Sequence, residues 1–304
     1  PVLAGDPMQL GPIVMRHVPC RPLSSPPGDT LLYKLDKNRF PDTAGFNPRL
    51  VTKLRYNYRS LPCILDLYSD LFYDSSLIAC VPAEDSQESA FLNQVIDTLP
   101  IKPSQTPPYA FIFCGVNGVN KQSPDSPSWF NPAETKSVFN LLLKLYKKGV
   151  RSEDIGVITP YQAQVKQLLN FLDESGYGGS SGLQKLKIGS VEEFQGQERE
   201  VIIISTVRTS KSMLSSDLQH ALGFVASPKR LNVAISRAKS LLVIFGNPHL
   251  LSADKKWLEL LFKAINNGTS CGCELPDHLA LLAREQALLN GGGDEPAQDE
   301  EGKE

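Results

Sequence analysis

Four polar segments of the sequence combine phosphate-binding side chains with residues that favour turns. They read GDPMQLGP at 5–12, NYRS at 57–60, SVEEFQGQE at 190–198 and KRLNVAISRAK at 229–239. Arg59 and Arg237 lie in the second and fourth segments, and a guanidinium stays protonated and donates two parallel hydrogen bonds to phosphate oxygens. Each segment alone has an ordinary structural interpretation, such as a turn or an arginine–carboxylate pair. Their joint occurrence favours a phosphate-binding function.

The third segment interrupts two apolar runs, LKIGSV and REVIIIST, with the residues EEFQGQE at 192–198. We expect these polar groups where the strands of a sheet end, because ligands bind at strand ends in open α/β sheets. Gly196 lets the backbone turn tightly and approach a ligand closely. Gln195 and Glu198 flank this turn, whereas Glu192 is expected to be solvated.

Short, continuous apolar runs rich in β-branched residues predict strands buried on both faces. They lie at 110–116, 155–160, 186–191, 200–207 and 241–246. Residues 131–149 and 161–176 have helical spacing, and the first of these starts with a proline and ends with lysines and a glycine. Strands that alternate with helices predict an α/β fold, with three layers (α/β/α) and a mostly parallel sheet.

The composition is ordinary for a globular protein, with 41% hydrophobic and 21% charged residues among 304. No apolar run approaches the roughly 18 residues that span a bilayer, and the start of the chain lacks a secretory signal. The net charge is −2, but residues 294–304 hold six of the acidic groups and one lysine, so the rest is mildly basic. Six cysteines without a Cys-x-x-Cys spacing predict neither a metal site nor a disulfide scaffold, and therefore reduced thiols.

In this order, the four segments resemble consecutive motifs of superfamily-one helicases, in the branch related to the nonsense-decay helicase. GDPMQL resembles the third motif, NYRS the fourth, SVEEFQGQE the fifth and NVAISRAK the sixth, while GVITPYQAQV is similar to the motif that grips the nucleic-acid backbone. SPSWFNPAE, GNPHLL and CGCELP, with SVEEFQGQE, look like the Armitage-type RNA helicases of small-RNA silencing. The resemblance covers residues 1–15 and 49–276.

The resemblance implies two RecA-like domains with ATP between them. Residues 1–48 would be the end of the first domain plus a linker, 49–276 the second domain, and 277–304 a short helix followed by a disordered acidic tail. The phosphate-binding loop Gly-x-x-x-x-Gly-Lys-Ser/Thr is absent, so ATP and Mg²⁺ are expected to be bound mainly by a first domain outside this chain. Since the chain starts with PVLAGDP and no methionine, we expect a fragment. We expect this fragment to be inactive alone because half of the ATP-binding cleft is missing.

By resemblance, four residues have catalytic roles: Gln9, Arg59, Glu198 and Arg237. Phosphoryl transfer to water needs positive charge around the γ-phosphate, and Arg237 would be the arginine finger, with Arg59 as a second contact. Gln9 would sense the γ-phosphate or orient the attacking water. Glu198 would contact the ribose or the catalytic cluster.

The nucleotide-binding set implied by the resemblance is Gly5, Asp6, Tyr58, Gln195, Gly196 and Glu198. Tyr58 would stack on the adenine, and the alternative for Tyr58 is an ordinary core tyrosine.

A second set of residues is suited to nucleic acid. Thr159, Pro160 and Tyr161 follow a predicted strand and precede a predicted helix, so the hydroxyl and nearby N–H groups can bind a phosphate. Ser190 and Thr206 are further candidates. Single-stranded RNA as substrate, 5′-to-3′ movement, silencing proteins of the piRNA pathway as partners, and a location in the cytoplasm, including ribonucleoprotein granules, all rest on the resemblance.

The function predicted from the sequence is the second motor domain of an ATP-dependent RNA helicase. One alternative is a truncated, non-enzymatic protein that binds RNA or silencing partners. Another is a DNA-directed helicase of the same superfamily. An unrelated α/β nucleotide-binding enzyme would have to reproduce four ordered motifs by chance.

Overall fold

A computed structural model describes residues 6, 8–10, 52–101, 108–124, 126–178, 183, 185–209 and 227–281. Its centre is a six-stranded sheet with the order β10-β3-β9-β8-β6-β7, in which every neighbouring pair is parallel. The strands are β3 (Phe111–Gly115), β6 (Ile155–Ile158), β7 (Lys187–Gly189), β8 (Arg199–Ser205), β9 (Ala238–Gly246) and β10 (Ser270–Gly272). The first five lie within or across the predicted apolar runs. The three residues of β10 have no hydrophobic pattern that would predict a strand.

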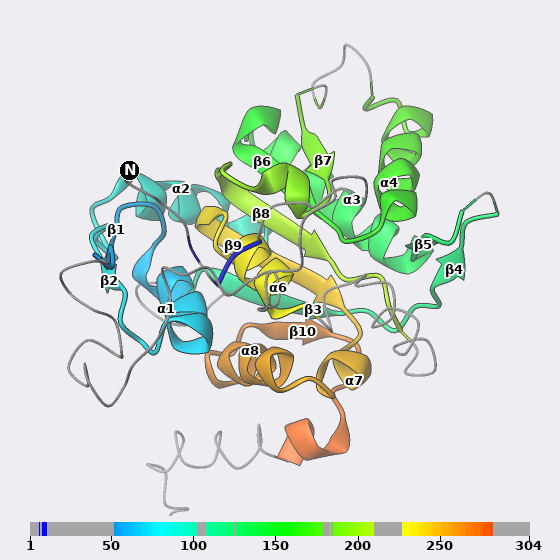
Figure 1. Cartoon of the computed structure of the whole chain (residues 1–304). Helices are drawn as coiled ribbons and strands as arrows, with labels where there is room; N and C mark the ends of the chain where they lie inside the picture. Colours follow the sequence, from blue (N-terminus) through cyan, green and yellow to red (C-terminus); the bar gives the residue numbers. More distant parts are fainter. Residues whose placement is uncertain are drawn as a thin grey trace, which may run out of the picture.

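Helices cover both faces of this sheet (Figure 1). On one face lie α3 (Pro132–Lys147) and α4 (Gln162–Glu174), and on the other α1 (Pro62–Phe72), α6 (Pro228–Ile235) and α8 (Lys255–Asn266). The predicted three-layer α/β/α architecture with a parallel sheet is therefore confirmed. None of the helices in the described ranges is long and apolar enough to cross a membrane.

The other described elements are short. They are β1 (Tyr56–Asn57), β2 (Ile78–Ala79), α2 (Gln87–Val95), η3 (Ile96–Thr98), β4 (Lys121–Gln122), β5 (Trp129–Phe130), η4 (Ser152–Asp154), η5 (Glu192–Phe194) and α7 (Pro248–Leu251). Residues 277–281 are helical. The predicted linker at 11–48 and the acidic tail lie outside the described residues, so the predicted domain boundaries stay predictions.

The central strands β8 and β9 form the buried axis of the fold. Residues 201–204 of β8 and 241–244 of β9 are 0% exposed, and burying each such aliphatic side chain stabilises the fold by about 1.5–3 kcal/mol. A seven-residue strand is about 20 Å long. β8 therefore holds its two ends, and the residues that flank them, at opposite edges of a rigid core.

A buried polar network joins α3, α4 and β8 at the carboxyl end of β8. The Asn131 side chain caps α3 by accepting hydrogen bonds from two first-turn N–H groups, and it donates to the carbonyl of Val207 over 3.1 Å. Glu134 is fully buried and accepts hydrogen bonds from the Ser205 hydroxyl (2.5 Å) and the Val207 N–H (2.9 Å). Gln164 of α4 donates to the Ser205 hydroxyl and accepts from the Asn131 N–H.

This network holds a strained residue. Val207 has a φ of 71°, a left-handed conformation that is unfavourable for a β-branched side chain and costs about 1–3 kcal/mol. Because Glu134 binds the N–H of Val207 and Asn131 binds its carbonyl, the surrounding structure fixes the turn. The network therefore sets the direction in which the chain leaves β8.

We expect Asn131→Ala to destabilise the fold more than Asp254→Ala. Asp254 caps α8 by accepting hydrogen bonds from the N–H groups of Lys256 and Trp257, and losing such a cap costs about 1 kcal/mol. Asn131→Ala loses a cap and also leaves the Val207 carbonyl without its partner, for a total of about 2–4 kcal/mol. Urea unfolding of both variants measures the difference. Equal losses would contradict the bridging role of Asn131.

The carboxyl of Glu134 predicts a pH-dependent stability. Burial raises the pKa of Glu134, and hydrogen bonds from Ser205 and Val207 lower it. Burial is the larger effect, so the pKa rises from 4.5 to about 7. The folded state then binds a proton more tightly than the unfolded state, so the free energy of unfolding falls as pH rises from 4.5 to 7. The total change is about 3 kcal/mol. We expect unfolding of Glu134→Gln to lack this component, and parallel pH curves for the two proteins would show the prediction to be wrong.

Candidate functional site

Three of the predicted catalytic residues converge at the amino end of β8 and β9. Glu198 directly precedes β8, and Arg237 directly precedes β9. The Arg199 N–H donates a hydrogen bond to the Arg237 carbonyl over 3.1 Å, which keeps the two strand starts together. Arg59 precedes α1, and the neighbouring Ser60 hydroxyl donates to the first carbonyl of β9 over 2.7 Å. The sheet thus brings together residues that are far apart in the sequence.

The two arginines share one partner. Arg59 donates from Nη1 to the Ser236 carbonyl (3.1 Å), and Arg237 donates from Nη2 to the Ser236 hydroxyl (2.8 Å). Arg59 also pairs with Glu198, with 2.5 Å between Nε and Oε2. Arg237 is only 2% exposed. Within the described part of the chain it forms no ion pair with a carboxylate.

The environment of Arg237 is unfavourable for a cation. Burial, followed by the nearby charge of Arg59, lowers the pKa of Arg237 to about 10, so the guanidinium remains protonated at neutral pH. Two neighbouring cations, one of them buried, gain stability when an anion binds between them. The arrangement is therefore chemically suited to a phosphate group.

The residues Asp6 and Gln9 lie against the same side of the fold. The Gln9 side-chain amide donates to the Asp6 carboxylate over 3.0 Å, and the Tyr73 hydroxyl donates to the same oxygen over 2.6 Å. Burial raises the pKa of Tyr73, so its hydroxyl stays protonated as a donor. Gly5 lies outside the described residues.

Two further contacts hold this segment in place. Asn232 of α6 donates from its side-chain amide to the Met8 carbonyl over 3.0 Å, and Gln195 donates to the Leu10 carbonyl over 3.3 Å. Asn232 is part of the motif NVAISRAK, which also contains Arg237. The sequence could therefore have indicated that Asn232 belongs to the site. Tyr73 has no sequence signal of this kind.

The structure separates two alternatives for Tyr58. Its ring is 77% exposed, so the interpretation as a core tyrosine is wrong and the ring is available for stacking. Gly196 has a φ of 78°, a conformation that glycine adopts without steric cost. The predicted tight turn at Gly196 is present.

Glu192 is not simply solvated, as we expected. It forms an ion pair with Arg230 of α6 over 2.8 Å, and its side chain is 33% exposed. Burial alone would raise the pKa of Glu192, but a backbone hydrogen bond and the Arg230 charge outweigh it and lower the pKa. This ion pair fastens η5 to α6.

The segment 190–198 runs from the carboxyl edge of the sheet, where the strands end, to the amino edge, where the strands begin. Ser190 follows the carboxyl end of β7, and Glu198 precedes the amino end of β8. Because all strands of this sheet are parallel, the segment must return to the edge where strands begin. The expectation that the whole segment lies at a ligand-binding strand end is therefore corrected: Ser190 lies at the carboxyl edge, whereas Gln195, Gly196 and Glu198 lead to the amino edge.

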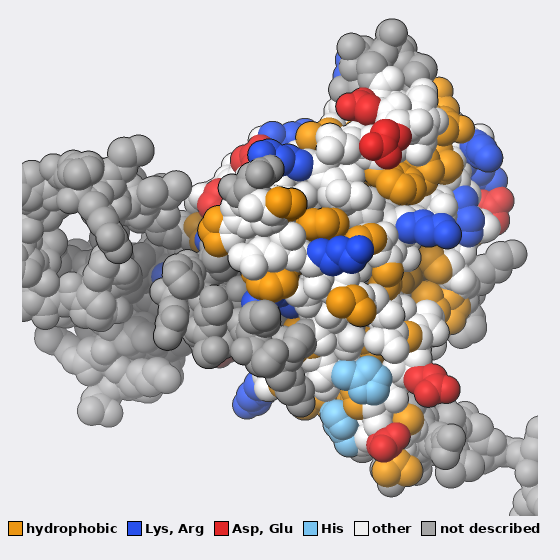
Figure 2. All heavy atoms as spheres, turned by 90° about the vertical axis from the view of Figure 1, so that its right-hand side faces the viewer, with side chains coloured by type: hydrophobic (Ala, Val, Ile, Leu, Met, Phe, Trp, Pro, Cys, Tyr) orange, Lys and Arg blue, Asp and Glu red, His pale blue; other side chains and the backbone are white. Residues whose placement is uncertain are grey.

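The predicted nucleic-acid residues follow the carboxyl ends of strands. Figure 2 shows the surface on that side of the molecule. Lys and Arg side chains lie there among hydrophobic ones, with acidic groups near the upper and lower ends. Thr159, Ser190 and Thr206 directly follow β6, β7 and β8. Pro160 is partly exposed.

Tyr161 is in the interior and not at the surface. It is 2% exposed, and the Arg208 guanidinium lies 5.8 Å from the centre of its ring and 4.5 Å from that of Trp129. The prediction for this position concerns its backbone N–H group and stays a prediction, whereas the Tyr161 ring itself is buried. The tyrosine directly precedes α4 and packs where that helix meets the sheet, which explains its burial.

Two threonine hydroxyls at this edge lack a protein partner among the described residues. Thr159 is 0% and Thr206 is 2% exposed, and the Oγ1 atom of each is buried without a hydrogen bond. Buried hydroxyls are usually hydrogen-bonded, so each exception requires an explanation such as water or a ligand. The absence of a side chain at Gly246 leaves space for Thr206, because a Cβ on residue 246 would lie 2.4 Å from the Thr206 Oγ1.

Comparison with known proteins agrees with the motifs. "Probable RNA helicase armi" of Drosophila melanogaster is 45% identical over 280 residues, which are 90% of this chain and 23% of that protein. "RNA helicase Mov10l1" of Mus musculus is 41% identical over 296 residues, 93% of this chain and 23% of that protein. "Regulator of nonsense transcripts 1 homolog" of Drosophila melanogaster is 31% identical over 260 residues, 86% of this chain and 20% of that protein.

The resemblance to the Armitage-type and nonsense-decay-type helicases is confirmed by these relatives, and the chain spans between a fifth and a quarter of their length. A family model described as an AAA domain matches residues 29–249. The matched range contains the fourth, fifth and sixth motifs. It also contains five of the six strands of the sheet, all but β10. On the strength of this match, the chain belongs to the AAA-domain family.

Proposed function

We propose that this chain is the second motor domain of an ATP-dependent RNA helicase, moving 5′ to 3′, that works in small-RNA silencing in the cytoplasm. One observation carries the proposal: Arg59 and Arg237 meet on Ser236, and the buried Arg237 has no ion pair with a described carboxylate. Two cations arranged this way fit the γ-phosphate of ATP. Two of the relatives are named as RNA helicases, which supports RNA as the substrate.

In this proposal each residue at the amino edge has a role. Arg237 stabilises the charge that develops on the γ-phosphate, and Arg59 is the second contact. Glu198 positions Arg59 through their ion pair. Gln9 senses the γ-phosphate or orients the attacking water, since its amide already lies beside Asp6. Tyr58 presents its exposed ring to the adenine.

Mg²⁺ and the β-phosphate need further groups. Among the described residues there is no cluster of three His, Cys, Asp or Glu side chains that could hold a metal ion. The hydrogen-bond donors at the amino edge are guanidinium and amide groups, which suit phosphate oxygens. The carboxylates of Asp6 and Glu198 there are already bound to Gln9, Tyr73 and Arg59. We therefore assign Mg²⁺ and the β-phosphate to a first motor domain, with ATP held between the two domains.

The carboxyl edge is the proposed RNA surface. The buried Oγ1 atoms of Thr159 and Thr206 and the strand-end position of Ser190 support it. Contacts of this type bind the RNA backbone and do not read its sequence. Direct contact with the Thr159 hydroxyl requires the residues that cover it to shift when RNA binds.

We expect Arg59→Ala and Arg237→Ala to lower RNA-stimulated ATP hydrolysis by about 10³-fold in the full-length protein that carries this sequence, while RNA affinity changes little. Arg59 is the safer variant for folding because it is partly exposed. Steady-state hydrolysis with single-stranded RNA, compared with single-stranded DNA, also distinguishes an RNA helicase from a DNA-directed one.

Arg151→Ala is the matched control, since Arg151 is an exposed arginine that pairs only with nearby acidic residues, Glu153 and Asp154, among those described. It should hydrolyse ATP at the wild-type rate. Undiminished turnover in both Arg59→Ala and Arg237→Ala would remove the proposed role of this cluster.

We expect Thr159→Val to weaken RNA binding about 5- to 10-fold without lowering stability. The substitution removes a buried hydroxyl that has no hydrogen bond to the described residues, so the fold loses no partner, while a hydroxyl–phosphate hydrogen bond is worth about 1–1.5 kcal/mol. Fluorescence anisotropy at a fixed salt concentration measures the affinity.

Thr269→Val is the matched control. Thr269 is equally buried, but its hydroxyl donates to the Ala264 carbonyl over 3.2 Å. This variant should lose stability and keep its RNA affinity. The same RNA affinity in Thr159→Val and wild type would contradict the proposed contact.

A further inference from the structure

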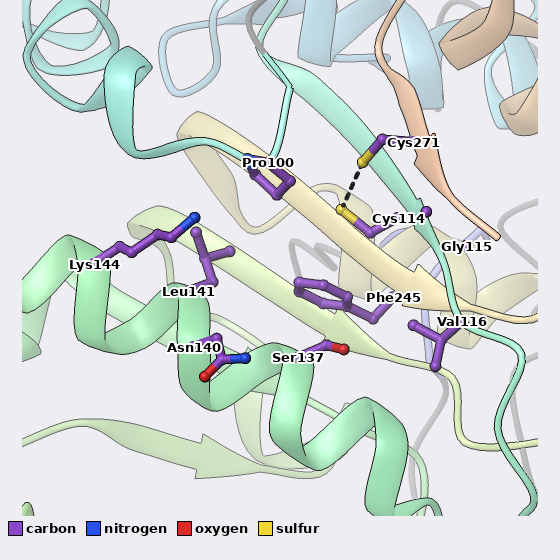
Figure 3. Close-up of a pocket in the computed structure, with 11 residues that line it drawn as sticks. Pro100, Cys114, Gly115, Val116, Ser137, Asn140, Leu141, Lys144, Phe245 and Cys271 are labelled. Atoms are coloured by element: carbon purple, nitrogen blue, oxygen red, sulfur yellow. Dashed lines mark hydrogen bonds between the residues drawn. The ribbon is translucent and has the colours of Figure 1, made fainter.

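A cavity of about 310 Å³ lies between α3 and the carboxyl-terminal parts of β3, β9 and β10. Figure 3 shows Ser137, Asn140 and Lys144 of α3 on one wall, with Cys114 of β3 and Cys271 of β10 on the other. None of the proposed nucleotide or RNA residues lines this cavity. The two thiols lie on the same wall and point toward one another (Figure 3).

The strand register places the two thiols as direct partners. Cys271 of β10 is paired with Cys114 of β3 in the parallel ladder, and their Sγ atoms are 3.5 Å apart. Neighbouring strands lie about 4.8 Å apart, inside the Cα–Cα range of about 4.4–6.8 Å that a disulfide spans. Closing the bond therefore needs a side-chain rotation and a small shift of β10. β10 is an edge strand of three residues with β3 as its partner in this sheet.

The two sulfurs have different environments. Cys114 is 4% exposed, whereas Cys271 is partly exposed at the cavity wall. The hydrogen bond with Cys114 lowers the pKa of Cys271, and the same contact, with burial, raises that of Cys114. The thiolate is the reactive form of cysteine. Of this pair, the accessible sulfur is thus the one that ionises first, with a protonated thiol beside it.

We propose that Cys114 and Cys271 form a redox-active dithiol that a small peroxide oxidises to a disulfide, with Cys271 as the attacking sulfur and Cys114 as the resolving one. The Cys271 thiolate attacks one peroxide oxygen, the O–O bond breaks, and the leaving oxygen takes a proton to become water. The product is a sulfenic acid at Cys271. The Cys114 thiol then attacks that sulfur, the S–O bond breaks, and a second water leaves as the disulfide forms.

This reaction balances as two thiols and one hydrogen peroxide giving one disulfide and two waters. The two electrons that the sulfurs lose reduce the peroxide. The bond would tie the edge strand β10 covalently to β3 across 157 positions of sequence. It would make the attachment of β10 to the sheet dependent on the redox state.

A third thiol makes the assignment testable. Cys273 lies close to β3, since a Cβ placed on Gly115 would be 2.8 Å from the Cys273 Sγ. Cleavage after Lys and Arg leaves Cys271 and Cys273 in one peptide, 264–284. Peptide mapping alone therefore cannot tell which of the two reacted. Substitutions have to decide between them.

The experiment treats the 304-residue chain with hydrogen peroxide, blocks the remaining thiols with an alkylating agent and counts them by mass spectrometry. We expect the wild type and Cys273→Ser to lose two thiols each and to recover them with dithiothreitol. Cys271→Ser should form no intramolecular disulfide. Cys114→Ser should accumulate a sulfenic acid at residue 271, trapped by dimedone at least about tenfold faster than any sulfenic acid at Cys63, whose pKa is raised by burial.

Cys80→Ser is the control. Cys80 is also partly exposed, but it directly follows β2 and does not line this cavity. It should behave as wild type. Thermal unfolding of the reduced variants checks that each remains folded. A disulfide that persists in Cys271→Ser, a disulfide lost in Cys273→Ser, or a wild type that keeps all its thiols would each overturn the proposal.

Discussion

The parallel pairing of β8 with β9 determines where the candidate groups lie. Arg199 is the register partner of Ala238, so the residues just before them, Glu198 and Arg237, are neighbours at the amino edge. A slip of one residue would turn every side chain of β8 to the opposite face and change which residue lies beside Arg237. Arg59 depends on the same pairing, because Ser60 is hydrogen-bonded to the start of β9.

The sequence predicted the elements better than the position of the site. Strands such as β8 and β9 are continuous apolar runs, which identify buried parallel strands without knowledge of their neighbours. The edge to which a polar segment belongs depends on the strand it leads into, and the pattern of residues 190–198 does not contain that information. The same limit explains Tyr161 and Tyr58: a tyrosine has one polar atom and a large apolar ring, so its burial depends on packing that only the fold defines.

The polar network around Glu134 shows a second limit. The sequence predicts a helix at 131–149, and in the structure Asn131 caps it and Glu134 lies in its first turn. Their contacts with Val207 lie 76 and 73 positions away in the chain, and no local pattern indicates them. Nothing in the sequence marks Val207 as strained either, because valine is an ordinary residue near the end of a strand. The strain follows from hydrogen bonds that fix the valine from both sides.

The two edges of the sheet are about 20 Å apart along β8, and the strand between them is a poor carrier of conformational change. Its central side chains are fully buried and close-packed, and such cores resist continuous deformation. The segment 190–198 also connects these two edges, as do helical crossovers such as α3 between β3 and β6. It is held by Glu192 on α6 and by Gln195 on the Leu10 carbonyl, with Gly196 as the point of backbone freedom. Residues 6 and 8–10 are held by Gln195 at the Leu10 carbonyl, but also by Asn232 at the Met8 carbonyl and by Tyr73 at the Asp6 carboxylate. A displacement of these residues would therefore act on all three contacts, while the close-packed core of β8 resists deformation.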